Sequence, residues 1–277
     1  LDIPSYLGYA NPNQNAGEIS TKGWELEASW REQIGDFKYS FSFNISDAKT
    51  VIDDLKGTQQ KGNLAKIEGG EFDEWYGYRA KGIYQNQQQV DNLPKMNSSV
   101  QIGDICYEDI SGPDGVPDGI ISDYDKVLLG GSLPRYTYGG NISLGYKDLD
   151  ISLAFQGVGK MKSRLSNVQV QPFMESGIGN VPKIIDGKFW RRNNSVEQNM
   201  AARYPRLSTS SATNNYTMSD FWLIDGSYFR LKNITVGYRI PVGRMLSQYI
   251  KNIRAYVSIN DLGEESYKAF KTFDIGD

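Results

Sequence analysis

The sequence contains no histidine and only one cysteine, Cys106, among its 277 residues. The absence of histidine excludes Ser-His and Cys-His nucleophiles and removes the commonest metal-binding side chain of proteins. A single cysteine cannot form a disulfide within the chain, and alone it fits no metal-site spacing. The carboxylates of Glu25 and Glu27 share one strand face, but no matching acid for glycosidase chemistry is visible. We therefore expect a protein that is not an enzyme.

Long apolar runs and clusters of positive charge are also missing. No stretch reaches the roughly 18 apolar residues of a transmembrane helix. The net charge is −3 without any lysine- or arginine-rich run, so nothing indicates a nucleic-acid partner. The first residues lack a basic start followed by an apolar core, and we expect no signal peptide in this sequence. These patterns therefore predict neither a transmembrane helix nor a nucleic-acid partner.

The sequence is rich in tyrosine, with 18 residues, and apolar residues alternate with polar residues in several segments. Three hairpins are predicted at about residues 24–46, 136–156 and 228–260, and Lys147-Asp148 forms the turn of the second. Alternation over about ten residues, with aromatic side chains near the strand ends, is typical of strands that span a membrane. A change of phase before Lys232-Asn233 predicts a β-bulge in the third hairpin. Half of a soluble β-sandwich is the plainer interpretation of any one hairpin.

Two long excursions, at about residues 47–135 and 157–227, separate these hairpins. Within the first, residues 74–84 are expected to form a strand, while residues 1–23 are expected to be loop and 245–250 a single helical turn. Loops of such length are rare in compact soluble domains, whereas outer-membrane barrels have long extracellular loops and short periplasmic turns. With the short turns in the periplasm, both excursions lie outside the cell. Six strands alone would leave two open edges in lipid, so we expect a segment of a larger antiparallel barrel.

The first excursion contains a cluster of aspartates and glycines that suggests a calcium site. With Gly119 at the sixth position of an EF-hand-like frame, carboxylates fall at three ligand positions, but Val116 occupies the third position and cannot ligate. The alternative is a solvated turn in which the carboxylates accept hydrogen bonds from backbone amides. The candidate ligands of a structural Ca²⁺ are Asp109, Asp114, Asp118, Asp123 and Asp125, with the backbone carbonyl of Ile120.

The excursions also contain aromatic and arginine side chains that suit a ligand or a partner protein. Aromatic faces next to polar groups bind sugars, and arginine pairs bind acidic groups. The alternative is that these side chains pack the loops against each other. The candidate substrate or partner residues are Trp75, Tyr76, Trp190, Arg191, Arg192, Tyr204, Tyr216 and Trp222.

Several motifs, in order and over about 240 residues, carry a resemblance to a known family. The motifs are NAGEISTKGWE at 15–25, Gly77-Tyr78 with Gly82-Ile83-Tyr84, GDICYED at 103–109, DGII at 118–121 with Asp125, residues 130–134 with 136–139, and GSYFRLKNITVGY at 226–238 followed by Pro241. Together they resemble the C-terminal barrel portion of SusC/RagA-type TonB-dependent outer-membrane transporters. The sequence departs from that pattern after Asn260-Asp261-Leu262, where the family continues to a final aromatic-ended strand.

The resemblance implies a plugged barrel of about 22 strands in the outer membrane of a Gram-negative bacterium. It implies import of oligosaccharides or oligopeptides, energised through TonB, with a SusD-like surface lipoprotein as partner. We expect the plug domain and the TonB-contacting segment to lie outside this chain. The alternative that the residues leave open is a soluble all-β carbohydrate-binding module. The two differ in what covers the apolar strand faces, which is lipid in the transporter and a second sheet in the soluble module.

Overall fold

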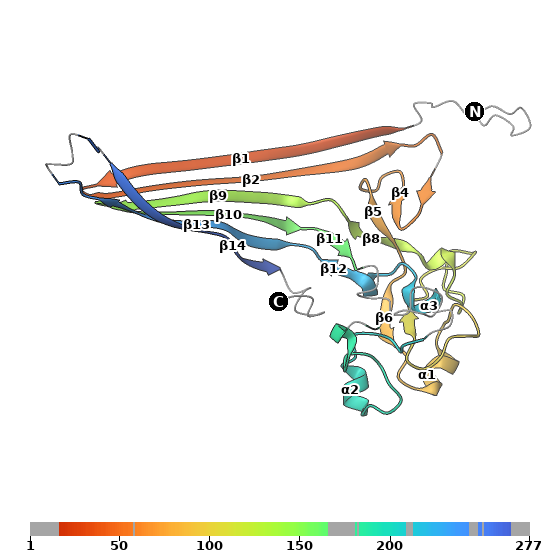
Figure 1. Ribbon diagram of the computed structural model, residues 1–277. Coiled ribbons are helices and arrows are strands. Elements are labelled where there is room, and N and C mark those ends of the chain that lie inside the picture. Colours follow the sequence, from red (N-terminus) through yellow and green to blue (C-terminus); the bar gives the residue numbers. More distant parts are fainter. Residues whose placement is uncertain are drawn as a thin grey trace, which may run out of the picture.

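The computed structural model describes residues 17–57, 59–165, 181, 183–208, 213–243, 249–250 and 252–266. Six long strands form one antiparallel sheet in the order β1-β2-β9-β10-β13-β14. Their bounds are Glu18–Ile34, Phe37–Asp54, Arg135–Tyr146, Leu149–Lys160, Tyr228–Ile240 and Ile253–Ser266. Each strand therefore pairs with the next of these six along the chain, and the sheet runs up and down (Figure 1).

Short turns connect the first two hairpins at one end of this sheet. Gly35-Asp36 joins β1 to β2, and Lys147-Asp148 joins β9 to β10 as predicted. Gly35 and Lys147 have φ values of 59° and 52°, as two-residue hairpin turns require. The helical turn expected at residues 245–250 falls mostly outside the described residues.

The first strand begins earlier than the sequence predicted. Residues 18–23 were expected to be loop, but they extend β1 and pair with the end of β2. Thr21 lies opposite Thr50, and their hydroxyls are 2.9 Å apart. The sequence did not predict this part of the strand because Ser20, Thr21 and Lys22 are all polar and do not alternate with apolar residues.

The predicted bulge in the third hairpin is confirmed. The register of β13 against β14 shifts between Leu231 and Asn233. On its other side, β10 shifts against β13 between Ala154 and Phe155. Lys232 is therefore the extra residue of the bulge, and the apolar and polar residues of β13 alternate regularly before it and after it.

The register sorts the side chains of the sheet onto two unlike faces. One row across the six strands consists of Trp30, Phe41, Ile142, Leu153, Ile234 and Ile259. The neighbouring row on the opposite face consists of Arg31, Ser40, Ser143, Ser152, Thr235 and Ser258. The first face, which we call the apolar face, continues in this way along the sheet, and the second is called the polar face.

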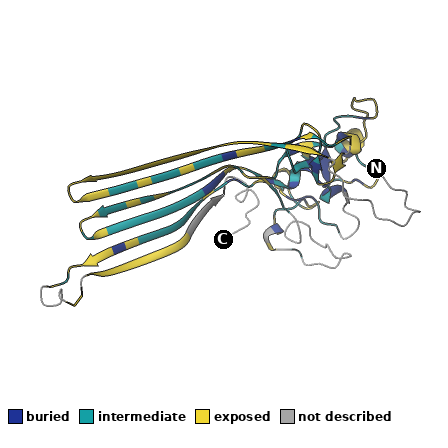
Figure 2. Cartoon of the chain, turned by 90° about the horizontal axis from the view of Figure 1, so that it is seen from above, coloured by how far each residue is buried: buried dark blue, intermediate teal, exposed yellow. Residues whose placement is uncertain are grey.

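The apolar face of the sheet is open rather than packed. Trp30 is 60% exposed and Val257 is 68% exposed, so no second layer covers them among the described residues. Figure 2 shows the sheet mostly in exposed and intermediate colours, while most buried residues gather beyond the end of the sheet opposite the short turns. Within the described part of the chain, the helices are too short or too polar to cross a bilayer.

The two excursions fold together at the end of the sheet opposite the short turns (Figure 1). We call the described residues between β2 and β9 and between β10 and β13 the loop domain. Its strands are β3 Gln60–Lys61, β4 Leu64–Lys66, β5 Glu74–Gly77, β6 Ala80–Ile83, β7 Ile105–Tyr107, β8 Val127–Gly131, β11 Lys162–Arg164 and β12 Leu223–Asp225. Its helices are α1 Gln87–Asn92, α2 Val196–Met200 and α3 Thr213–Tyr216. The strand expected over residues 74–84 is thus divided into β5 and β6.

The loop domain has a core of its own, to which both excursions contribute. Its buried members are Tyr78, Ile105, Tyr107, Ile121, Ile185, Tyr204, Trp222 and Ile224. The ring centroids of Tyr78 and Tyr107, from the first excursion, lie 5.3 Å apart with the rings tilted, and those of Tyr204 and Trp222, from the second, lie 6.1 Å apart. Segments far apart in sequence therefore share one hydrophobic cluster.

Candidate functional site

A buried ion pair joins the two excursions of the loop domain. Asp104 is 2% exposed, and its Oδ1 lies 2.7 Å from Nε of Arg206. The same carboxylate accepts hydrogen bonds from Asn215 Nδ2 at 2.9 Å and from the backbone N–H of Gln101 at 2.8 Å. A buried charge is tolerated only when paired and hydrogen-bonded, and here both conditions are met. The pair therefore fixes the second excursion against the first.

Hydrogen bonds between side chains and backbone also join the two excursions, along a contact that we call the seam. The Asn215 side chain accepts from Ile105 N at 2.8 Å, and the Tyr107 hydroxyl donates to Asn214 O at 2.5 Å. Burial raises the pKa of the Tyr107 hydroxyl, so it remains a proton donor. The excursions thus form one folded unit rather than two independent loops.

A second contact across the seam is made by Asp220. Its Oδ1 accepts from the backbone N–H of Ala80 at 2.7 Å, and its own backbone N–H donates to Tyr78 O at 3.1 Å. Burial raises the pKa of the Asp220 carboxyl above its ordinary value, although the hydrogen bond from Ala80 opposes that rise. Burial therefore makes the ionised Asp220 carboxylate less stable in the folded protein than it is in water.

Most of the aromatic residues expected to face a ligand lie in the core instead. Trp222, Tyr204, Trp190 and Tyr76 are 2%, 1%, 6% and 9% exposed. Their large apolar surfaces are covered by the rest of the loop domain, because an excursion of this size needs a core to be ordered. This packing favours the alternative in which these four side chains hold the loops together, and a role for them in binding a substrate or partner stays a prediction.

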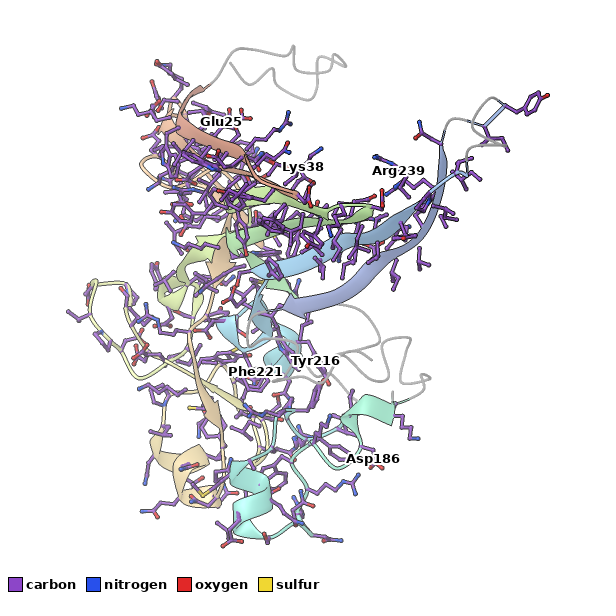
Figure 3. All side chains as sticks on the ribbon, turned by 90° about the vertical axis from the view of Figure 1, so that its left-hand side faces the viewer. Glu25, Lys38, Asp186, Tyr216, Phe221 and Arg239 are labelled. Atoms are coloured by element: carbon purple, nitrogen blue, oxygen red, sulfur yellow. The ribbon has the colours of Figure 1, made fainter. Side chains whose placement is uncertain are left out.

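The remaining members of that set differ in their surroundings. Tyr216 stacks on Trp222 at 5.8 Å, and burial raises its pKa to about 12. Trp75 is half-buried and donates from Nε1 to Lys162 O at 2.7 Å. Arg191 and Arg192 are exposed, and Nη2 of Arg191 lies 2.9 Å from Oδ1 of Asp186. Figure 3 labels Asp186 in the loop domain. Of the predicted substrate or partner residues, the two arginines are the ones at the surface.

The aspartate loop is ordered by its own backbone. Asp125 is fully buried and accepts hydrogen bonds from the backbone N–H groups of Ile110, Ser111 and Ser122 at 2.7–3.1 Å. Asp109 accepts from Gly119 N at 2.7 Å. Backbone amides thus take the place that a cation would occupy for these two carboxylates.

The other aspartates of the loop point elsewhere. Asp118 accepts from Ile120 N at 3.0 Å, and Asp123 pairs with Lys126 at 2.7 Å, while Asp114 is exposed. Lys126 holds the pKa of the Asp123 carboxyl below its ordinary value. Among the described residues, no three carboxylate, cysteine or histidine side chains come together as a metal site would require. The EF-hand-like frame is not formed, so the donor set does not fit Ca²⁺, and calcium binding stays an unsupported prediction.

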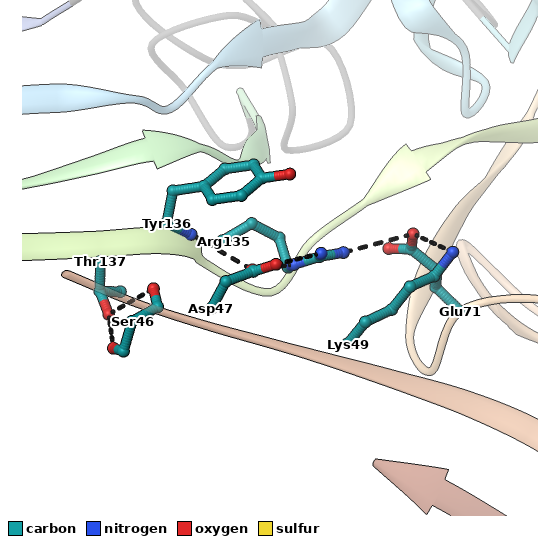
Figure 4. Close-up of polar contacts among 7 residues, drawn as sticks. All are labelled: Ser46, Asp47, Lys49, Glu71, Arg135, Tyr136 and Thr137. Carbon is teal, nitrogen blue, oxygen red and sulfur yellow. Dashed lines mark hydrogen bonds and ion pairs between the residues drawn. The ribbon is translucent and has the colours of Figure 1, made fainter. Parts of the chain in front are cut away.

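A chain of charges connects the sheet to the loop domain (Figure 4). Asp47 near the end of β2 forms a bidentate pair with Arg135 at the start of β9, with Nη2 to Oδ2 at 2.6 Å. Glu71 of the loop domain lies 3.7 Å from Arg135 and 3.3 Å from Lys49. Beside the chain, the hydroxyls of Ser46 and Thr137 are 2.8 Å apart. The outer end of the sheet is therefore tied to the base of the first excursion.

Sequence reasoning missed the residues that hold the loop domain in place. The partners Asp104 and Arg206 are separated by 102 residues, and Asp47 and Arg135 by 88. No spacing rule links side chains so far apart in sequence. The sequence feature that could have indicated these contacts is the length of the two excursions, because ordered segments of that size need a core and a polar network.

Comparison with known proteins gives relatives over nearly the whole chain. No protein-family model matches it. TonB-dependent receptor P3 and TonB-dependent receptor P26 of Formosa agariphila are each 27% identical over 273 residues. These matches cover 94% and 95% of this chain and 26% of each relative. The chain therefore spans about a quarter of the length of these relatives.

Two solved structures share the fold. The RagAB peptide transporter aligns with a TM-score of 0.68 at 19% identity, over 99% of this chain and 29% of the other. The RagAB peptide importer in its open-open state aligns with a TM-score of 0.65 at 17% identity, over 100% and 28%. The six-stranded sheet with its loop domain is thus an arrangement found within larger chains.

Proposed function

We propose that the chain is a segment of the outer-membrane barrel of a TonB-dependent receptor of the SusC/RagA type and forms part of an importer's wall, because its relatives are TonB-dependent receptors and it shares its fold with the RagAB transporter. The loop domain would be a folded cover at the outer mouth of that barrel. The chain would act only within the whole transporter, of which it supplies a fraction of the circumference.

The exposed apolar face of the sheet is the observation that carries this proposal. From Phe37 to Ile45 the apolar positions of β2 span nine residues, close to the 9–11 residues of a tilted membrane strand. At the turn end of this face, Phe37 pairs with Tyr146, and Leu149 with Tyr238, giving an aromatic row. Aromatic rows at the edge of an apolar band are typical of transmembrane barrels.

The two edges of the sheet support a larger barrel. Within the described residues, β1 pairs only with β2, and β14 only with β13. An unpaired strand edge in lipid leaves backbone N–H and C=O groups without partners, at several kcal/mol each. Further strands of the same barrel would satisfy both edges.

The lengths of the connections support an orientation in the membrane. The turns Gly35-Asp36 and Lys147-Asp148 lie at one end, and the loop domain lies at the other (Figure 1). In outer-membrane barrels the short turns face the periplasm. We therefore propose that the loop domain lies outside the cell, where the substrate would arrive.

The cargo and partners are proposed from the relatives. The transporter would import oligosaccharides or oligopeptides, draw energy through TonB, hold a plug inside its barrel and work with a SusD-like surface lipoprotein. The names of the relatives support dependence on TonB, and the RagAB structures are of a peptide transporter. The alternative of a soluble carbohydrate-binding module is disfavoured, since such a module would cover its apolar face with a second sheet.

Cysteine labelling of the whole transporter in intact cells tests the orientation. In a Cys106→Ser background, Val116→Cys marks the loop domain and Lys147→Cys marks a short turn. A membrane-impermeant maleimide is expected to label the first in intact cells and the second only after the outer membrane is opened. Labelling of Lys147→Cys in intact cells would contradict the orientation.

Uptake tests the function itself. Cells with and without the transporter are given labelled oligosaccharides and oligopeptides, with and without a protonophore. Transporter-dependent uptake that stops when the proton gradient collapses is the expected result. Release of the protein in buffer without detergent, or uptake that is independent of the transporter, would overturn the proposal.

A further inference from the structure

Two lysines face each other on the apolar face, at the end of the sheet opposite the short turns. Lys22 on β1 pairs in register with Lys49 on β2, and strand alternation places both on the same face as Trp24. Both lysine side chains are exposed. Directly opposed residues of an antiparallel pair have Cβ atoms about 5 Å apart, and like charges there repel each other. An anion that contacts both ammonium groups would relieve this repulsion.

Positive charge is in excess around the lysine pair. Nζ of Lys49 lies 3.3 Å from Oε1 of Glu71, as Figure 4 shows, but Glu71 also lies 3.7 Å from Arg135. Arg135 in turn pairs with Asp47. Lys22 forms no ion pair with another described residue. Three cations therefore share two carboxylates at this place.

Other carboxylates of the same hairpin lie farther from the turns than the lysines do. Asp53 follows Lys49 by four residues, about 13 Å along the strand, and accepts a hydrogen bond from Ser20 Oγ at 3.0 Å. Glu18 precedes Lys22 by four residues, at the beginning of β1. An anion held between the two lysines is therefore not in contact with either carboxylate.

The position of the lysines along the strands matches the headgroups of the outer leaflet. Lys49 follows Phe37, the first residue of β2, by twelve residues, which is about 40 Å of strand. Strands tilted by about 40° in a barrel rise about 30 Å over that length, just beyond an apolar band about 25 Å tall. Trp24 is the neighbour of Lys22 on this face toward the turns and is 50% exposed, as at an interfacial aromatic girdle.

We propose that Lys22 and Lys49 bind the phosphate of a lipid headgroup in the outer leaflet, with Trp24 against the upper part of the acyl chains. This inference rests on the proposed function, because it takes the apolar face as the lipid-facing surface. Ammonium groups bind phosphate as point charges, and long lysine stems cover apolar surface while their charged ends reach the headgroups. Because Glu71 belongs to the loop domain, the lipid binds where the first excursion is tied to the sheet.

Quenching of Trp24 fluorescence by brominated lipids tests the site in the whole transporter. The signal of Trp24 is the difference between the wild type and Trp24→Phe, each reconstituted in phosphatidylcholine vesicles. One set of vesicles contains brominated phosphatidic acid, and the other contains the same fraction of brominated phosphatidylcholine, so only the headgroup of the quencher differs. Stronger quenching by the phosphatidic acid is expected, because the lysines concentrate this lipid beside Trp24.

Removal of the two charges should abolish the preference for phosphatidic acid. Lys22→Gln/Lys49→Gln is expected to lower the relative affinity for this lipid about thirtyfold, and Lys22→Gln alone about fivefold. The single variant matters because it breaks no ion pair between described residues. Lys22→Arg/Lys49→Arg keeps both charges and should keep the preference. Lys38→Gln removes a positive charge from the polar face of the same hairpin and should leave the quenching unchanged.

Each variant is compared with its own Trp24→Phe counterpart, and its heat-dependent mobility on a denaturing gel reports an intact barrel. Equal quenching of the wild type by the two brominated lipids would overturn the site, and so would a preference that survives in Lys22→Gln/Lys49→Gln. Loss of the preference in inorganic phosphate, but not in chloride of equal ionic strength, would also overturn it, because the lysines would then bind phosphate from solution. Failure of the proposed function is distinguishable, because neither lipid would then quench Trp24.

Discussion

Ile105 in the loop domain is completely buried, whereas Val257 in the sheet is 68% exposed, although both lie in β-strands. In the loop domain, strands of a few residues surround a shared aromatic core and could do so in water. In the sheet, apolar side chains line up in rows across six strands with no described layer above them. The first region excludes water by folding on itself, and the second needs an apolar solvent on one side.

Polar groups divide between the two regions in the same way. Inside the loop domain, the carboxylates of Asp104 and Asp125 are buried, and each accepts several hydrogen bonds. On the sheet, polar groups form open ladders, such as the hydroxyls of Thr235 and Ser258 at 2.8 Å. Satisfied polar networks order the loops, while the hydroxyl ladder makes the polar face wettable. The following substitutions test this contrast.

Removal of a core aromatic should have the largest effect and should be confined to the loop domain. Trp222 is 2% exposed, packs on Phe221 at 4.9 Å and donates from Nε1 to Asn215 O at 2.7 Å. Trp222→Ala is expected to destabilise the loop domain by about 3–5 kcal/mol. Limited proteolysis of the whole transporter in its membrane should show cleavage in both excursions while the barrel stays heat-modifiable.

An exposed aromatic of the same domain is the control for this change. Tyr124 is 58% exposed, so Tyr124→Ala should leave the proteolysis pattern unchanged. Loss of the barrel together with the loop domain in Trp222→Ala would show that the two regions fold as one unit, against the contrast drawn above.

Two adjacent residues offer a matched test of the faces of the sheet. Ile142 and Ser143 are neighbours on β9, and the register directs them to opposite faces. Ile142→Arg places a charge in the lipid and should cost about 2–4 kcal/mol, whereas Ser143→Arg faces the polar interior and should cost little. Urea unfolding in detergent or lipid vesicles measures both. Equal costs, or a larger cost for Ser143→Arg, would reverse the assignment of the faces.

The sheet could be predicted from the sequence because its signal is local. Alternation with a period of two fixes each strand and its faces, and a break in that alternation at Lys232 located the bulge. The loop domain could not be predicted in this way, since its core and its ion pair unite residues about a hundred positions apart. Local composition was also ambiguous there, because aspartate and glycine serve calcium loops and backbone-capped turns alike. The hydrogen bonds to Asp125 and Asp109 reveal the second use.

The ion pair between Asp47 and Arg135 tests whether the two regions depend on each other. Its side chains are only 8% and 15% exposed, and it lies where β2 leaves the sheet. Asp47→Ala should cost about 1.5–3 kcal/mol, as expected for a hydrogen bond to a charged group. The measurement is the urea dependence of proteolysis in the loop domain. Asp54→Ala removes the partner of Lys56 in an exposed pair on the same strand and should cost far less. Similar costs for the two variants would mean that the junction contributes no coupling.

The smallest effect is expected from the carboxylate of Asp220, and its size depends on pH. Burial raises the pKa of Asp220, so the folded protein binds this proton more tightly than the unfolded chain does. The stability of the loop domain should therefore fall as pH rises from the ordinary aspartate value through the raised one, and stay lowered at neutral pH. Asp220→Asn keeps an oxygen that can accept from Ala80 N and removes the charge, so it should flatten this decline.

At acidic pH, where both forms are neutral, the variant and the wild type should match, and at neutral pH the variant should be the more stable. The favourable charges of Lys162 and Arg79 near Asp220 make the gain modest. Asp186→Asn, at a carboxylate that is 77% exposed, is the control for charge removal in the same domain. Parallel stability curves for Asp220→Asn and the wild type would show that water reaches this carboxylate. The loop domain would then exclude water less completely than its contrast with the sheet requires.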